Sequence, residues 1–159
     1  MIQIDEQAKA NIELNTICII EQFNGDIKNT QEKLANVCAI FPPSSKIDIV
    51  LLLSEKEKME MVPQCENDSI YYFTNKSTTI FNQVKEVRLK SLLSQKHDFL
   101  LTLPTENYKY VKKLLKLKNH VFSCGAENKC LTNFDLTFLL DEKNTYEQLL
   151  KQIKNYLIQ

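Results

Sequence analysis

The segment Ile47–Leu53 (IDIVLLL) constrains the fold most, because nearly every position in it is apolar. A strand with one face in water alternates apolar and polar residues, whereas a strand covered on both faces is a continuous apolar run. Strands of this kind belong to parallel sheets that carry helices on both sides. The segment therefore predicts an α/β domain built around a buried sheet.

Other short apolar runs have the length of strands, and amphipathic segments separate most of them. The predicted strands are Thr16–Ile20, Ile47–Leu53, Ile70–Phe73, Phe99–Leu103, Val121–Cys124 and Phe134–Leu140. Apolar residues recur at a helical period over 26–40, 79–93, 104–117 and 145–157. This alternation favours right-handed βαβ units.

We therefore predict an α/β fold. It is a three-layer α/β/α sandwich with a mostly parallel sheet of five or six strands, Rossmann-like or flavodoxin-like, without a glycine-rich loop. A chain of 159 residues fits one domain. We assign 16–159 to that domain and 1–15 to an N-terminal extension that could add a helix.

Charge and hydropathy exclude several classes of protein. Lys plus Arg and Asp plus Glu are equal at 20 each, so no net charge draws the chain to nucleic acid or a membrane. No apolar run approaches the roughly 20 residues that span a bilayer. The first residues lack the basic start and apolar core of a signal peptide. These features predict a cytoplasmic protein.

Glycine, arginine and histidine are too few for the common catalytic and cofactor motifs. The two glycines, Gly25 and Gly125, lie far apart, whereas a phosphate-binding loop needs several close together. Arg88 is the only arginine, so a clamp of several arginines is excluded. His97 and His120 each precede a strand, at the edge of a parallel sheet that does not bind ligands. We predict no cofactor and no catalytic residue, which argues against an enzyme.

The five cysteines, taken with the predicted compartment, are expected to be free thiols. Two of them, Cys18 and Cys38, lie in apolar segments and are predicted to be small core residues. The pair Cys124 and Cys130 has no second pair and no zinc-knuckle spacing, so no metal site is predicted. The remaining one is Cys65.

Three predicted strands begin with an aspartate: Asp48, Asp98 and Asp135. One interpretation is a cluster of functional carboxylates. The other is that aspartate favours turns and strand starts. We favour the second, because these positions lie at the amino ends of their strands, whereas ligands bind beyond the carboxyl ends.

The loops after the strands are where a ligand site would lie. They are polar, although surface loops are polar in general. The plain-surface interpretation is therefore the stronger one. The ligand-binding candidates at this edge are Asn24, Gly25, Asn75, Thr105 and Gly125.

A row of lysines on one predicted helix is the candidate partner-binding surface. Spacings of three and four residues place them on one stripe, which would suit an acidic partner, RNA or an anionic membrane. The solvated side of an amphipathic helix has the same pattern, and we favour that interpretation. Only Tyr108 and Tyr110 interleave with the stripe, so nucleic acid is not expected. The stripe consists of Lys109, Lys112, Lys113 and Lys116.

The order of segments resembles a family of small uncharacterised α/β proteins of Bacteroidota. The matching segments are Thr16–Glu21, Ile47–Leu53, Ile70–Phe81, His97–Leu103, Val121–Gly125 and Phe134–Asp141. The chain departs from the family pattern at Ser123-Cys124-Gly125, where members carry K-V-G, and at Pro104 after the fourth strand. The resemblance implies the same fold and carries no activity.

A weaker likeness is to the N-terminal half of sugar transferases of the heptosyltransferase type. Only Asp98–Leu103 and Val121–Gly125 support it, and these residues do not predict the nucleotide-sugar half of those enzymes, so a transferase is not expected. Two functional hypotheses follow. The first is a non-enzymatic interaction or adaptor module with a protein partner. The alternative is a binder of a small nucleotide or sugar, or a degenerate transferase-like enzyme, that uses the carboxyl-end rim of the sheet.

Overall fold

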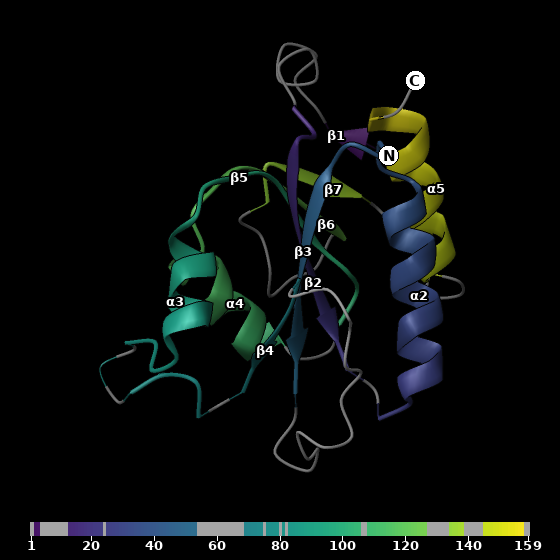
Figure 1. Ribbon diagram of the computed structural model, residues 1–159. Coiled ribbons are helices and arrows are strands. Elements are labelled where there is room, and N and C mark those ends of the chain that lie inside the picture. The colour runs from purple at the N-terminus through teal and green to yellow at the C-terminus, as the bar shows by residue number, and fades with distance from the viewer. Residues whose placement is uncertain are drawn as a thin grey trace.

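A central sheet with helices on both sides forms the structure, a computed structural model (Figure 1). It describes residues 2–3, 13–23, 25–53, 69–74, 76–79, 81, 83–105, 108–126, 134–138 and 145–157. Within these ranges the strands are β1 (Ile2–Gln3), β2 (Thr16–Gln22), β3 (Lys46–Leu52), β4 (Ile70–Phe73), β5 (His97–Thr102), β6 (His120–Ala126) and β7 (Leu136–Phe138). The helices are α2 (Ile27–Ala39), α3 (Val87–Ser94), α4 (Tyr108–Leu117) and α5 (Thr145–Leu157).

The order of the strands identifies the kind of α/β fold. Across the sheet it is β1-β7-β6-β5-β2-β3-β4, and only the pairing of β1 with β7 is antiparallel. When the six parallel strands are numbered along the chain, their order is 3-2-1-4-5-6, that of the doubly wound Rossmann fold rather than the flavodoxin-like 2-1-3-4-5. The prediction of an α/β sandwich with a mostly parallel sheet is confirmed.

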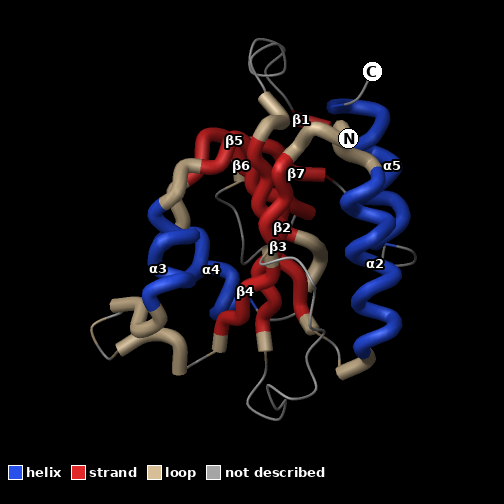
Figure 2. Tube along the Cα trace, in the orientation of Figure 1, coloured by secondary structure: helices blue, strands red, loops and turns tan. Residues whose placement is uncertain are grey.

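Two apolar cores lie on opposite faces of the sheet. Helices α2 and α5 cover one face, and α3 and α4 cover the other (Figure 2). Alternate residues of β2 divide between the two cores, because successive side chains of a strand point to opposite faces. Ile17 and Ile19 pack toward α2 and α5, and Cys18 and Ile20 pack into the other core. Both faces of the sheet are therefore buried, as the continuous apolar strands predict.

One predicted helix is shorter than expected. The apolar spacing over 79–93 predicts a single helix, but α3 begins only at Val87. Upstream, Thr78 and Val84 form an antiparallel bridge, and the backbone N–H of Lys85 donates to the carbonyl of Ser77. Glu86 then caps α3 by accepting a hydrogen bond from the Leu89 N–H at 3.1 Å. Tertiary pairing of the turn therefore outweighs the local helical period.

The N-terminal extension contributes a strand. Residues Ile2 and Gln3 form β1, which pairs with Phe138 and Thr137 of β7. The helix that the sequence could add falls mostly on residues 4–12, outside the described residues. Among the cysteines, Cys18 and Cys124 are buried thiols and Cys38 is half-buried. The other two cysteines also lie outside the described residues.

The strand-leading aspartates lie at the amino edge of the sheet, as predicted, and two of them hold neighbouring strands in register. The Asp98 carboxylate accepts from the Thr16 N–H at 3.0 Å, and the Thr16 hydroxyl accepts from the Asp98 N–H at 3.0 Å. Asp135 and Ser123 repeat this reciprocal pair at 2.8 and 3.1 Å. Each pair satisfies two backbone donors between adjacent strands.

The third aspartate belongs to a buried polar cluster. Asp48 and His97 are 2 % and 0 % exposed, and His97 Nε2 lies 2.8 Å from Asp48 Oδ2. Lys118 is buried nearby and donates to the carbonyls of Gln95 and Asn119. Burial lowers the pKa of Lys118, while the charges of Cys18 and Asp48 raise it. The cluster satisfies polar groups buried near the amino edge of the sheet.

Candidate functional site

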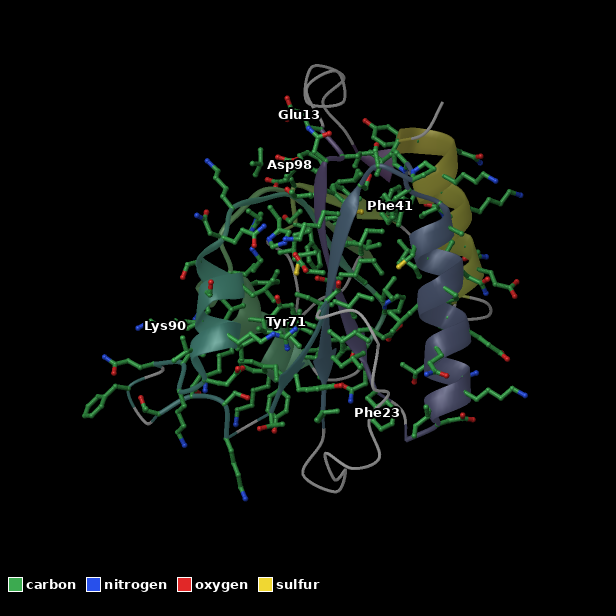
Figure 3. All side chains as sticks on the ribbon, viewed as in Figure 1. Glu13, Phe23, Phe41, Tyr71, Lys90 and Asp98 are labelled. Atoms are coloured by element: carbon green, nitrogen blue, oxygen red, sulfur yellow. The ribbon has the colours of Figure 1, made fainter. Side chains whose placement is uncertain are left out.

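The topology places the candidate site between β2 and β5. In an open α/β sheet, ligands bind beyond the carboxyl ends of the strands, at the point where the strand order reverses direction. Here β2 and β5 are neighbours, with Ile20 opposite Thr102, and their following helices α2 and α4 lie on opposite faces. Figure 3 labels Phe23 at this carboxyl edge and Asp98 at the opposite edge. We call the carboxyl ends of β2 and β5 the switch point.

Glu21 is a buried carboxyl group at the switch point. It lies in the second-to-last position of β2 and is 5 % exposed. Its Oε1 accepts from the Gln22 N–H at 2.8 Å, and its Oε2 has no hydrogen-bond partner among the residues that the structure describes. Burial raises the pKa of Glu21 to about 7, against smaller lowering effects of the Gln22 N–H and the Lys33 charge. The group is therefore protonated over much of the pH range below neutrality.

Two helix side chains accompany Glu21 on the α2 and α5 face. Tyr146 of α5 donates its hydroxyl to the carbonyl of Lys33 in α2, and the Lys33 ammonium lies 5.5 Å from the centre of the Tyr146 ring. Burial raises the pKa of Tyr146, and the nearby Glu21 charge raises it further. These contacts join α2 to α5 beside the buried carboxyl group.

The opposite face of the switch point carries two more polar groups. The Gln22 amide donates to the carbonyls of Phe23 and Leu52 at 3.1 Å each, which fixes the orientation of its side chain. Its Oε1 is left without a partner within the described ranges, as is Oγ1 of Thr102, which is 3 % exposed. The switch point thus presents three buried oxygen atoms with unused hydrogen-bonding capacity.

The predicted rim residues are only partly placed by the structure. Gly25 follows β2 with a φ of 87°, a left-handed conformation that favours glycine, and half-buried Thr105 follows β5. Both therefore lie next to the switch point. Asn24 and Asn75 lie outside the described residues.

Gly125 has a packing role. It was expected to end its strand, but β6 continues through Ala126. A Cβ atom on Gly125 would lie 2.5 Å from the ring of Phe134. The absence of a side chain lets that aromatic ring pack directly on the backbone of β6.

The site residues that sequence reasoning missed lie inside the strands. The predicted first strand ends before Glu21 and Gln22, and the predicted fourth strand includes Thr102, so none of the three is among the predicted ligand-binding residues. The available signal is a polar residue at the end of an apolar run, in TICIIEQ and FLLT. Their burial and unused oxygen atoms depend on packing that the sequence alone does not display.

The lysine stripe lies on the outer surface of α4. Lys109, Lys112 and Lys116 are exposed and Lys113 is half-buried. The inward side of the same helix buries Val111 and Leu114. The lysines are therefore separated from the switch point by the body of the helix, and partner binding through them stays a prediction.

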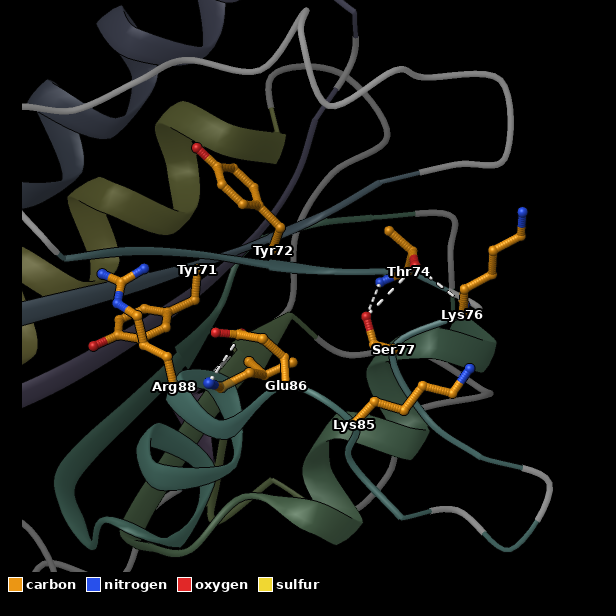
Figure 4. A pocket seen from close by; sticks show the side chains of 9 residues that line it. Tyr71, Tyr72, Thr74, Lys76, Ser77, Lys85, Glu86 and Arg88 are labelled. Atoms are coloured by element: carbon orange, nitrogen blue, oxygen red, sulfur yellow. Dashed lines mark hydrogen bonds between the residues drawn. The ribbon is translucent and has the colours of Figure 1, made fainter.

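A surface groove of about 380 Å³ lies between β4 and α3 (Figure 4). Among the described residues that line it, the basic side chains are Lys76, Lys85 and Arg88, and the acidic one is Glu86. The guanidinium of Arg88 stacks 4.2 Å from the centre of the Tyr71 ring and donates to the carbonyl of Ile70. The groove lies two strands away from β2 in the sheet order.

The fold and this polar carboxyl edge define an α/β protein of the doubly wound class. The chain belongs to a family of unknown function, DUF6913, whose model matches residues 3–159. Comparison with curated proteins and with solved structures finds no match. Within the described ranges, no helix has the length and apolar character needed to cross a membrane.

Proposed function

We propose that this protein binds a small, uncharged polar ligand at the switch point. The observation that carries the proposal is the set of unused oxygen atoms of Glu21, Gln22 and Thr102, buried at the carboxyl ends of neighbouring strands. A buried polar atom without a partner is costly and needs an explanation, and a bound ligand supplies the missing hydrogen bonds.

The chemistry of the three groups points to a ligand with both donors and acceptors. The Gln22 amide oxygen accepts, the Thr102 hydroxyl does either, and the Glu21 carboxyl group donates below its pKa of about 7. A phosphate does not fit, because a buried carboxyl group lies at the switch point and the chain has no glycine-rich loop. A nucleoside has hydroxyl and amide-like groups, and an unmodified sugar has hydroxyl groups that both donate and accept.

Binding to the switch point depends on the Thr102 hydroxyl. Calorimetric titration with a panel of nucleosides and monosaccharides is expected to find a ligand whose affinity falls about tenfold in Thr102→Val, because one buried hydrogen bond is lost. Glu21→Gln is expected to lower the affinity for the same ligand.

Thr78→Val is the matched control, since Thr78 is also buried and its hydroxyl also lacks a partner within the described part of the chain, but it lies beyond β4. Equal affinities in wild type and Thr102→Val, or equal losses in Thr102→Val and Thr78→Val, would refute the proposed site.

A protein-interaction or adaptor role is the second candidate, and the exposed lysines of α4 favour it. Three ammonium groups on one helix face would attract an acidic protein surface. Affinity purification from the native cell is expected to recover a partner that the double variant Lys109→Glu with Lys112→Glu no longer retains. A cytosolic location and a protein rather than a nucleic-acid partner belong to this same proposal. Recovery of the partner by the double variant would contradict it.

A further inference from the structure

The groove between β4 and α3 is large enough for a small ligand. It is lined by the carboxyl end of β4, the turn that follows it and the first turn of α3. Its volume of about 380 Å³ lies within the range of ligand pockets. Tyr71 faces α3 along the groove, whereas Tyr72 points to the other side of β4 (Figure 4).

Positive charge dominates the groove. Lys76 and Lys85 lie on one side and Arg88 on the other. Glu86, the acidic group among the described lining residues, turns its carboxylate to the Leu89 N–H as the cap of α3. Among the described residues, neither Lys76 nor Lys85 forms an ion pair with a carboxylate. The charges of Lys76 and Lys85 are therefore available to an anion.

Hydrogen bonds hold the walls of the groove in place before any ligand arrives. Stacking on Tyr71 and the bond to the Ile70 carbonyl fix the only arginine of the chain. Across the groove, the Ser77 hydroxyl accepts from the Thr74 N–H at 2.8 Å, and the Thr74 hydroxyl accepts from the Lys76 N–H at 3.1 Å. A fixed guanidinium and a fixed turn lower the entropy cost of binding.

We propose that this groove binds a small phosphate-bearing molecule. Two ammonium groups and one guanidinium around an open cavity match a compact dianion better than a neutral ligand. The lack of a glycine-rich loop does not oppose this site, because side chains rather than backbone N–H groups supply the contacts. The groove is separate from the switch point and complements it with the opposite ligand chemistry.

Calorimetric titration of the full chain with inorganic phosphate and with ribose 5-phosphate tests the groove. Both probes are expected to bind saturably, and Lys85→Glu is expected to weaken them about tenfold or more, because a cation near the anion is replaced by a like charge. Lys76→Glu, in the adjoining turn, is a second variant with the same expected result. Tighter binding of ribose 5-phosphate identifies an organic phosphate as the ligand, and equal binding identifies the free anion, both within the proposal.

The matched control is Lys28→Glu, an exposed lysine on α2, which covers the other face of the sheet. It is expected to leave both titrations unchanged. Equal weakening in Lys85→Glu and Lys28→Glu would mean that the anions only screen the surface charge, and the proposal would be wrong. Glu21→Gln is expected to leave phosphate binding intact, so failure here is distinguishable from failure of the switch-point proposal.

Discussion

Replacing Asp48 with alanine is expected to lower the free energy of unfolding by about 3 to 5 kcal/mol, the usual cost of removing one partner of a buried ionisable pair. In the wild type, His97 Nε2 lies 2.8 Å from the Asp48 carboxylate. The substitution removes this partner, although His97 is fully buried. It also removes the carboxylate that raises the pKa of the buried Lys118. Urea unfolding followed by circular dichroism measures the change.

Two comparison variants distinguish the stabilising effect of this buried cluster from that of an exposed aspartate at the start of a strand. Asp48→Asn keeps an acceptor for His97 and is expected to cost less than Asp48→Ala. Asp135→Ala removes an exposed strand-leading aspartate that bonds only to Ser123 among the contacts of the described region, and about 1 kcal/mol is expected. If Asp48→Ala cost no more than Asp135→Ala, the buried cluster would not have the stabilising role assigned to it.

Glu21→Gln is expected to make the ligand-free protein more stable at high pH, by about 3 kcal/mol. The folded-state pKa of Glu21 is raised from 4.5 to about 7. Between these values the unfolded chain has lost the proton and the folded chain retains it, so the stability of the wild type falls as pH rises. Below pH 4.5 both states are protonated, and above about pH 7 the loss is complete.

The measurement is the free energy of unfolding of both proteins from pH 4 to pH 9. The difference between them is expected to grow across the window from 4.5 to about 7 and then stay constant. Groups common to both proteins cancel in that difference. The exposed Glu13→Gln is the control and is expected to change the free energy by less than about 0.5 kcal/mol at every pH. A difference that does not depend on pH would contradict the assigned burial of Glu21.

Periodicity and apolar runs predicted most of the fold. The run Ile47–Leu53 predicted a strand covered on both faces, and β3 is buried by helices on both sides. The sequence did not predict the order of the strands. Which strands become neighbours depends on contacts between residues far apart in the chain, such as the hydrogen bonds between Asp98 and Thr16. The helix expected over 79–93 was wrong in its first half, where the pairing of Thr78 with Val84 replaces helical hydrogen bonds.

The edge of the sheet that holds the candidate site was predicted, but the residues were not. Loop residues such as Thr105 were chosen because function concentrates in loops. The unused oxygen atoms instead belong to strand residues, Glu21 and Thr102, whose burial follows from packing of helices on both faces. The groove beside β4 was also missed, since the sequence shows one arginine and scattered lysines rather than a shared cavity.

Amide chemical-shift mapping during titration with the tightest-binding nucleoside or sugar tests the switch-point site most directly. The account predicts that the largest shifts fall on residues 21–23 and 102–105, on both sides of the point where the strand order reverses. Shifts confined to the groove of β4 and α3 or to the outer surface of α4, or no saturable shift with any member of the panel, would contradict it.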